Sequence, residues 1–235
     1  MQHILRREQI SKHLALRWST LLSNKELAAQ IPDTYKLLTE SFLSYTYNAK
    51  WRHYHTYLHL ERMFEEFDKQ RDKLKHPECV EFAIFLHDMI HVPGAKNNHI
   101  KNARVARAWL RAMSADALTV RRVARLITVA TKHPQSPKQR LTSDEKYMSD
   151  FILYDFSLSY DAVLGQSRDM RREFVNFTDE EFKSIHSDYI MTMMRDHTYH
   201  TKYYSHYDVY TKENMRRLLQ NMDQVVCARP TDKRS

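Results

Sequence analysis

The chain has 235 residues, of which 42% are hydrophobic and 28% are charged, and its formal net charge is +8. This composition is typical of a folded globular protein and excludes an intrinsically disordered chain. Gly94 and Gly165 are the only glycines, too few for the phosphate-binding loops of Walker or Rossmann sites, and their scarcity favours helices over sheets. The positive charge keeps nucleic acid open as a partner, but no known nucleic-acid-binding motif accompanies it.

Cysteine content and apolar runs bear on the compartment. Cys79 and Cys227 are too few and too far apart for a disulfide framework, and they fit a reducing compartment. No apolar run reaches the roughly 18 residues of a transmembrane helix, and the N-terminal MQHILRREQI has no apolar signal-peptide core. We therefore expect a cytoplasmic protein without a membrane partner, and the oligomeric state stays open.

Hydrophobic periodicity predicts amphipathic helices through the first part of the chain. The first helical segment lies within residues 8–30, and the next starts at Pro32. Thr56 is the expected N-cap of a further helix, whose buried stripe contains Leu60 and Phe64.

The apolar stretch FAIFLHDMIHV, residues 82–92, has a histidine and an aspartate at its centre. His76-Pro77-Glu78 predicts the start of its helix, and Pro93-Gly94 predicts the end. Such a helix should be buried, and it would take His87 and Asp88 with it. Burying a carboxylate costs roughly several kcal/mol unless the group is paired or binds a metal. The pair is therefore either a hydrogen-bonded couple or part of a cation site.

The rest of the chain continues as helices without a domain boundary, a repeat or a low-complexity linker. Thr178-Asp179-Glu180-Glu181 predicts a capping box. We expect residues 1–227 to form a single all-α domain and residues 228–235 to be a disordered tail. Further helices are expected at 102–113, 118–131, 143–153, 178–195 and 208–226. One more is expected to begin after a turn at 157–161 and to run to about residue 174.

Candidate metal ligands lie on three of these helices. His55 and His59 share a face if their helix begins early enough, His87 and Asp88 lie on a second helix, and Asp150 lies on a third. Imidazole nitrogens and carboxylate oxygens together suit zinc, manganese or iron and leave positions for water and substrate.

A local alternative is the segment HDMIH, in which His87 and His91 are spaced like the two histidines of HExxH zinc peptidases. The residue after His87 is Asp88, however, whose side chain is one methylene shorter than glutamate. Pro93-Gly94 also ends the predicted helix directly after His91. These two features weigh against a peptidase. With partners for His87 and Asp88 on two other helices, His91 is expected next to the ligands or at the surface.

The segments HYHTYLHL (residues 53–60) and FLHD (residues 85–88), followed by Asp150, resemble the HD superfamily of metal-dependent phosphohydrolases, whose signature is H…HD…D. One bacterial branch, with YHT-x-x-H before FHD, is also similar in an ATKH stretch (residues 130–133) and an RREY-like stretch (residues 171–174). The resemblance covers residues 45–199 and implies a single-domain, HD-type helical bundle.

The resemblance implies that His59, His87, Asp88 and Asp150 bind the metal. It also implies that His55 is the general acid, so that His55 and Asp88 are the catalytic pair. An exchange of the two roles between His55 and His59 stays open.

Two positions depart from that branch. Asp150 is preferred over Asp155 as the last ligand because of its spacing from Arg171-Arg172, but the branch has a further acid where this chain has Ile152. The branch also has an acid where this chain has Asn97. A site without these acids could hold one metal rather than two.

Four residues are candidates to contact a substrate phosphate: Lys132, His133, Arg172 and His99. The alternative for Lys132 and His133 is a solvated helix C-terminus, where cations are favoured by the helix dipole. The alternative for Arg172 is a solvated surface position.

The sequence thus predicts a metal-dependent phosphohydrolase, with a metal-bound hydroxide that attacks a nucleotide or another small phosphate mono- or diester. The cofactor would be a divalent metal ion, with Mn, Zn, Fe, Ni and Mg as candidates. The alternative is a catalytically weakened HD-fold nucleotide sensor or a nucleic-acid-binding module.

Overall fold

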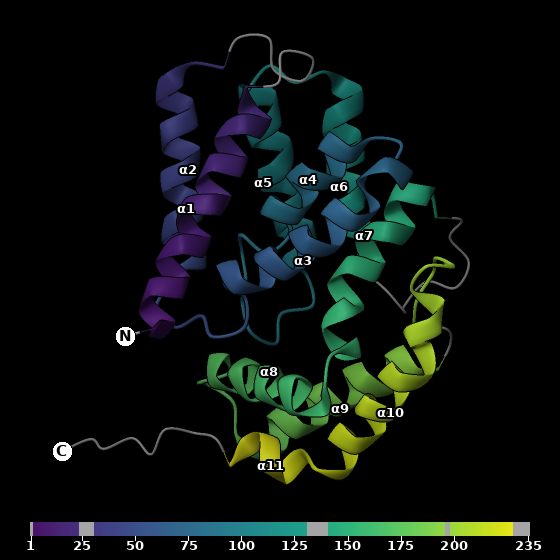
Figure 1. Ribbon diagram of the computed structural model, residues 1–235. Helices are drawn as coiled ribbons and strands as arrows, with labels where there is room; N and C mark the ends of the chain where they lie inside the picture. The colour runs from purple at the N-terminus through teal and green to yellow at the C-terminus, as the bar shows by residue number, and fades with distance from the viewer. Residues whose placement is uncertain (1, 24–30, 131–140, 196–197, 228–235) are drawn as a thin grey trace, which may run out of the picture.

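The computed structural model describes residues 2–23, 31–130, 141–195 and 198–227. Within these ranges the regular structure is helical and no strand occurs, so the predicted all-α fold is confirmed (Figure 1). The helices are α1 (Gln2–Leu22), α2 (Asp33–Tyr47), α3 (Tyr57–Gln70), η1 (Arg71–Lys73), α4 (Pro77–Leu86), α5 (Asn98–Ala112), α6 (Ala117–Ala130), α7 (Ser143–Leu153), η2 (Tyr154–Ser157), α8 (Tyr160–Glu173), α9 (Asp179–Met194), η3 (Ser205–Tyr207), α10 (Asp208–Gln220) and α11 (Met222–Val226).

Helix α4 is the centre of the hydrophobic core. Every residue from Cys79 to Leu86 is buried, and the helix contacts α1, α3, α5, α6 and α7. The indole of Trp18 packs edge-on against Phe82 and Phe85, with ring centroids 5.7 and 5.1 Å apart. An apolar sequence on all sides of a helix requires such complete coverage, and the predicted burial of this stretch is confirmed.

The end of α4 differs from the sequence prediction, because the helix stops at Leu86 rather than near Pro93-Gly94. Side chains from other segments form hydrogen bonds with the backbone groups that a longer helix would have paired. The guanidinium of Arg52 donates to the carbonyls of Asp88 and Met89, at 2.8 Å in each case. The amide side chain of Asn102 accepts from the N–H of Ile90 at 2.7 Å and donates to its carbonyl at 2.9 Å. These tertiary hydrogen bonds satisfy the buried backbone without a helix.

Other predicted helix boundaries agree more closely with the structure. Thr178 and Glu181 form the expected capping box at the start of α9, and α3 begins directly after Thr56. The last predicted helix is divided at Asn221 into α10 and α11. The predicted tail, residues 228–235, lies outside the described residues.

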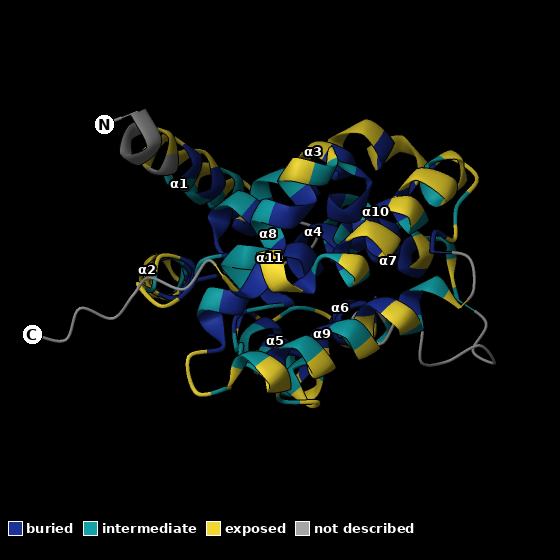
Figure 2. Cartoon of the chain, turned by 90° about the horizontal axis from the view of Figure 1, so that it is seen from below, coloured by how far each residue is buried: buried dark blue, intermediate teal, exposed yellow. Residues whose placement is uncertain are grey.

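The helices form two groups that meet at the site described below. Helices α1 to α7 make up the larger group, and α8 to α11 pack against one another beneath it in Figure 1. Buried residues from both groups belong to one continuous hydrophobic cluster, so the chain forms a single domain. Seen from below, buried residues line the surfaces where helices face each other, and exposed residues lie on the outside (Figure 2). Of the described helices, none combines the length and apolar character needed to cross a membrane.

Candidate metal centre

His87 lies directly after α4 and is 1% exposed. Its Nδ1 lies 2.8 Å from the carbonyl oxygen of Ile84. Because a carbonyl can only accept, Nδ1 carries a proton. Nε2 lies 3.1 Å from Oδ2 of Asp88. A neutral ring would place two acceptor atoms against each other in a buried space, so a cation or a proton must lie between Nε2 and Oδ2.

The carboxyl group of Asp88 is ionised. Burial alone would raise the pKa of Asp88, but the neighbouring imidazoles of His87, His55 and His91 outweigh burial and hold this pKa well below its usual range. The group that faces Nε2 of His87 is therefore a carboxylate and not a neutral acid.

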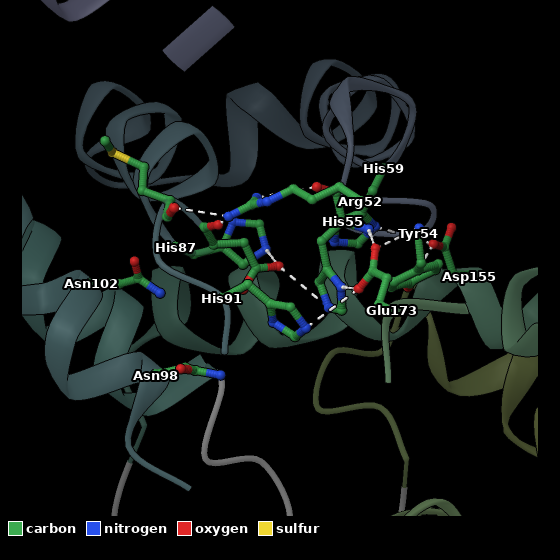
Figure 3. A network of polar contacts seen from close by, with 12 residues as sticks. Arg52, Tyr54, His55, His59, His87, His91, Asn98, Asn102, Asp155 and Glu173 are labelled. Atoms are coloured by element: carbon green, nitrogen blue, oxygen red, sulfur yellow. Dashed lines mark hydrogen bonds and ion pairs between the residues drawn. The ribbon is translucent and has the colours of Figure 1, made fainter. Parts of the chain in front are cut away.

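His59, in the first turn of α3, reaches the same space from another segment (Figure 3). Its Nδ1 lies 3.2 Å from Oδ2 of Asp155. Asp155 also accepts from the hydroxyl of Tyr54 at 2.9 Å and from Arg62 at 2.6 and 2.7 Å. Burial raises the pKa of Asp155, but the hydrogen bond from His59 and the charge of Arg62 outweigh it, so this pKa is lowered and the group is a carboxylate.

The contact with Asp155 decides the state of the His59 imidazole. A carboxylate accepts, so Nδ1 of His59 is the donor, and burial lowers the pKa of His59 itself. The ring is therefore neutral, with its lone pair on Nε2. A carboxylate that accepts from the far nitrogen of a histidine is the usual partner of a metal-binding imidazole.

His59, His87 and Asp88 each offer one ligand atom within 4.8 Å of those of the other two. Ligands bound about 2.1 Å from one cation lie roughly 3.0–3.4 Å apart at octahedral to tetrahedral angles, and the separation of 3.1 Å between His87 and Asp88 falls in this range. Two neutral imidazoles and a carboxylate suit zinc, manganese or iron. The residues present therefore fit a divalent cation.

Glu173, the last residue of α8, joins the second group of helices to this site. Its Oε1 accepts from the backbone N–H groups of His53, Tyr54 and His55, at 2.8, 2.7 and 2.9 Å. Its Oε2 lies 2.5 Å from Nδ1 of His55 and 3.4 Å from Nε2 of His91. Burial raises the pKa of Glu173, but the charge of His55 and these hydrogen bonds outweigh burial and lower the pKa to about 2. A buried carboxylate thus fixes the segment that precedes α3.

His55, His91 and Glu173 also converge within 4.8 Å, but their contacts differ from those of the first group. The 2.5 Å between His55 and Glu173 is the length of a strong hydrogen bond and is short for two ligands of one cation. The ring of His91 stacks on that of His55, with centroids 3.7 Å apart. Nε2 of His55 lies 3.9 Å from Oδ2 of Asp88.

The surroundings of His55 favour its protonated form. Burial lowers the pKa of His55, but the charges of Glu173 and Asp88 outweigh burial and raise this pKa above its usual value. His55 is therefore a proton-carrying imidazole beside the candidate cation position. Four residues named from the sequence, His55, His59, His87 and Asp88, lie together in the structure.

Asp150 is not brought to this cluster, although the sequence argument placed it among the ligands. It is fully buried, and its Oδ1 accepts from the backbone N–H of His200 at 2.8 Å. Its Oδ2 accepts from the backbone N–H and hydroxyl of Thr201, at 2.9 and 2.6 Å. Asp150 thus anchors the segment that follows α9. The short helix η2 after α7 instead turns Asp155 toward His59, so the alternative that was set aside is the carboxylate in contact with the site.

The structure describes two of the four residues that were predicted to contact a phosphate. Arg172 donates to Asp169 of its own helix at 2.8 Å and is partly exposed. His99 lies in the first turn of α5, half-buried and outside both groups of candidate ligands. Lys132 and His133 lie outside the described residues.

Sequence reasoning missed two residues of the site and set a third aside. Arg52 had no distinguishing signal, because its partners Asp88 and Met89 lie far away in the chain. Glu173 directly follows the pair Arg171-Arg172, which the sequence argument did single out. Asp155 was set aside in favour of Asp150. His91, which was expected next to the ligands or at the surface, stacks on His55 and faces Glu173.

No protein-family model, curated protein or solved structure matches the chain. What the site can do therefore follows from its residues. They include a buried group of side chains that could hold a divalent cation, next to a histidine that is held by a buried carboxylate.

Proposed function

We propose that the protein is a metal-dependent phosphohydrolase of the HD type that acts on a nucleotide or another small phosphate mono- or diester. The observation that carries this proposal is the buried Nε2 of His87, which faces the carboxylate of Asp88 at 3.1 Å where His59 also converges. A divalent cation held there supplies Lewis-acid activation of water and of a phosphoryl oxygen.

His55 supports the same reaction class, because hydrolysis of a phosphate ester requires a proton for the leaving oxygen. Glu173 accepts from Nδ1 of His55 and favours the protonated ring, so Nε2 carries the proton that can be transferred. Stacking against His91 holds the plane of the ring. After transfer, the proton on Nδ1 stays hydrogen-bonded to Glu173.

The positive net charge of +8 favours an anionic substrate. The proposed role of Arg172, His99, Lys132 and His133 in phosphate contact rests on the sequence resemblance alone. Arg172 could release Asp169, its partner within the same helix, to meet a phosphate.

A second candidate is an HD-fold nucleotide sensor or nucleic-acid-binding module that does not turn over its ligand. Asn97 and Ile152, which stand where the similar branch has acids, favour this candidate. It shares the metal-binding group with the first candidate and differs from it in lacking hydrolysis.

The test combines elemental analysis with a substrate screen. We expect about one divalent metal per chain in the wild type and none in Asp88→Ala, with Asp223→Ala as the control because the Asp223 side chain is 86% exposed. The metal-replete protein should hydrolyse members of a panel of nucleotides and phosphodiesters with Mn²⁺, Zn²⁺, Ni²⁺ or Mg²⁺ added. Equal metal in wild type and Asp88→Ala would contradict the site. Binding of a nucleotide or nucleic acid without hydrolysis would favour the second candidate.

A further inference from the structure

A cavity of about 230 Å³ lies beside α1 and α2, next to the segment that leads into α3. Three of its lining residues are basic, namely Lys50, Arg52 and His53, and none of the described residues that line it is acidic. The aromatic residues Tyr47 and Tyr57 also line the cavity. The candidate metal ligands do not line this cavity, so it is separate from the candidate metal centre.

Arg52 is a buried cation whose partners in the described part of the chain are neutral. It is 3% exposed, and its hydrogen bonds go to the backbone carbonyls of His55, Asp88 and Met89. Its Nε is buried and has no acceptor among the described residues. A buried guanidinium with a free donor and no anionic partner is unfavourable on its own, and it lies in the wall of a cavity of matching charge.

We propose that this cavity binds a small oxyanion, the phosphate or carboxylate group of a metabolite, with Arg52 and Lys50 as its charge partners. Guanidinium and ammonium groups are the usual donors to such groups. Lys50 is exposed and His53 half-buried, so the basic lining extends from the interior to the surface. This site does not depend on the proposed phosphohydrolase activity.

The position of Arg52 couples the cavity to the candidate metal centre. Its Nη1 and Nη2 hold the segment of His55 against the turn that carries Asp88 (Figure 3). An anion in the cavity would place a negative charge beside the same guanidinium that joins these two segments. Occupancy of the cavity and metal binding are then linked, and each should change the affinity for the other by the same factor.

The test is calorimetric titration of inorganic phosphate into metal-free protein. Metal-free protein is used because the candidate metal centre then offers no cation to which phosphate could bind. We expect one phosphate per chain, with a Kd that rises at least tenfold in Lys50→Glu and in Arg52→Gln. The Kd should be unchanged in Lys73→Glu. Asp88→Ala should not weaken the binding, because it removes a negative charge. Lys73 is an exposed residue of η1 away from the cavity, and its substitution matches the charge change of Lys50→Glu.

Three outcomes would overturn the proposal. Equal weakening by Lys73→Glu would assign the binding to net charge alone. If phosphate binding persists in Lys50→Glu but is lost in Asp88→Ala, the phosphate binds at the candidate metal ligands and not in the cavity. Absence of binding by phosphate, together with acetate and citrate, would exclude an oxyanion site. If Arg52→Gln does not fold by circular dichroism, Lys50→Glu and His53→Asn decide the question.

Discussion

Each group of candidate ligands contains two histidines and one carboxylate, but the charges around the histidines differ. In the first group, Nδ1 of His59 donates to Asp155, a carboxylate that also pairs with Arg62, and burial lowers the pKa of His59. In the second group, Nδ1 of His55 contacts Glu173, and the charges of Glu173 and Asp88 outweigh burial and raise the pKa of His55. The net charge around the ring therefore decides whether a histidine is suited to bind a cation or to donate a proton.

Among the substitutions that test the difference between the two groups, Asp88→Asn should have the largest effect. We expect the metal to be lost and hydrolysis to fall at least about 10³-fold, because an amide lacks the negative charge that completes the ligand set. The pKa of Asp88 lies well below its usual range, so the ionised carboxylate stabilises the metal-free fold, and the metal-free variant should be less stable than the metal-free wild type. Urea denaturation without metal at neutral pH measures this loss. Equal or greater stability of the variant would show that the neighbouring histidines do not stabilise the charge of Asp88.

Glu173→Gln probes the second group. The metal content should stay at the wild-type level, while kcat falls by about 10²-fold for alkyl phosphate esters, because His55 loses the charge that favours its protonated form. The fall should be much smaller for p-nitrophenyl phosphate, whose leaving group needs little protonation. Loss of metal from this variant, or the same fall with both substrates, would contradict the separate roles of the two groups.

Asp155→Asn tests the residue that accepts a hydrogen bond from the candidate ligand His59, and it leaves the ligand itself unchanged. We expect metal affinity to fall by roughly 10–100-fold, because Nδ1 of His59 loses the carboxylate that fixes its proton. Asp150→Asn is the matched control, since Asp150 is an equally buried carboxylate that is hydrogen-bonded to Thr201 instead. Its metal affinity should be unchanged, measured by competition with a chelator. A larger effect of Asp150→Asn would restore the ligand set expected from sequence.

The sequence predicted those features that depend on neighbours in the chain. The buried stretch before His87 and the capping box at Thr178 follow from local pattern, and both are found. The contacts of Glu173 with His55 and of Asp155 with His59 span 118 and 96 residues. No periodicity carries such information, because both pairs depend on how the two groups of helices pack.

The end of α4 shows the same limit at the level of the backbone. Pro93-Gly94 is a valid local stop signal, yet Arg52 and Asn102 pair the backbone from Asp88 to Ile90 and allow the helix to end earlier. The comparison of HDMIH with HExxH peptidases assumed the longer helix. In the structure, His91 follows the end of that helix and lies against His55 and Glu173.

His186 on α9 is the reference for both groups, because it shows what burial alone does to a histidine. It is 3% exposed, stacks on Phe182, and has its Nε2 3.4 Å from the hydroxyl of Ser167. Burial lowers the pKa of His186 to about 4. Because the unfolded value is about 6.5, the unfolded chain binds more protons than the folded one between these values. The stability contributed by neutral His186 is therefore complete above pH 6.5 and is lost as the pH falls toward 4.

From pH 7 to pH 5, this single group should lower the free energy of unfolding by about 2 kcal/mol. His186→Gln keeps a polar side chain but cannot titrate, so its stability should fall by that much less over the same interval. Urea denaturation of metal-free wild type and variant at both pH values measures the difference, and the other histidines cancel in the comparison. Equal losses in the two proteins would show that His186 is protonated in the folded state. Burial would then not suffice to keep a histidine neutral, and the neutral state of His59, which burial favours against its hydrogen bond to Asp155, would lose its support.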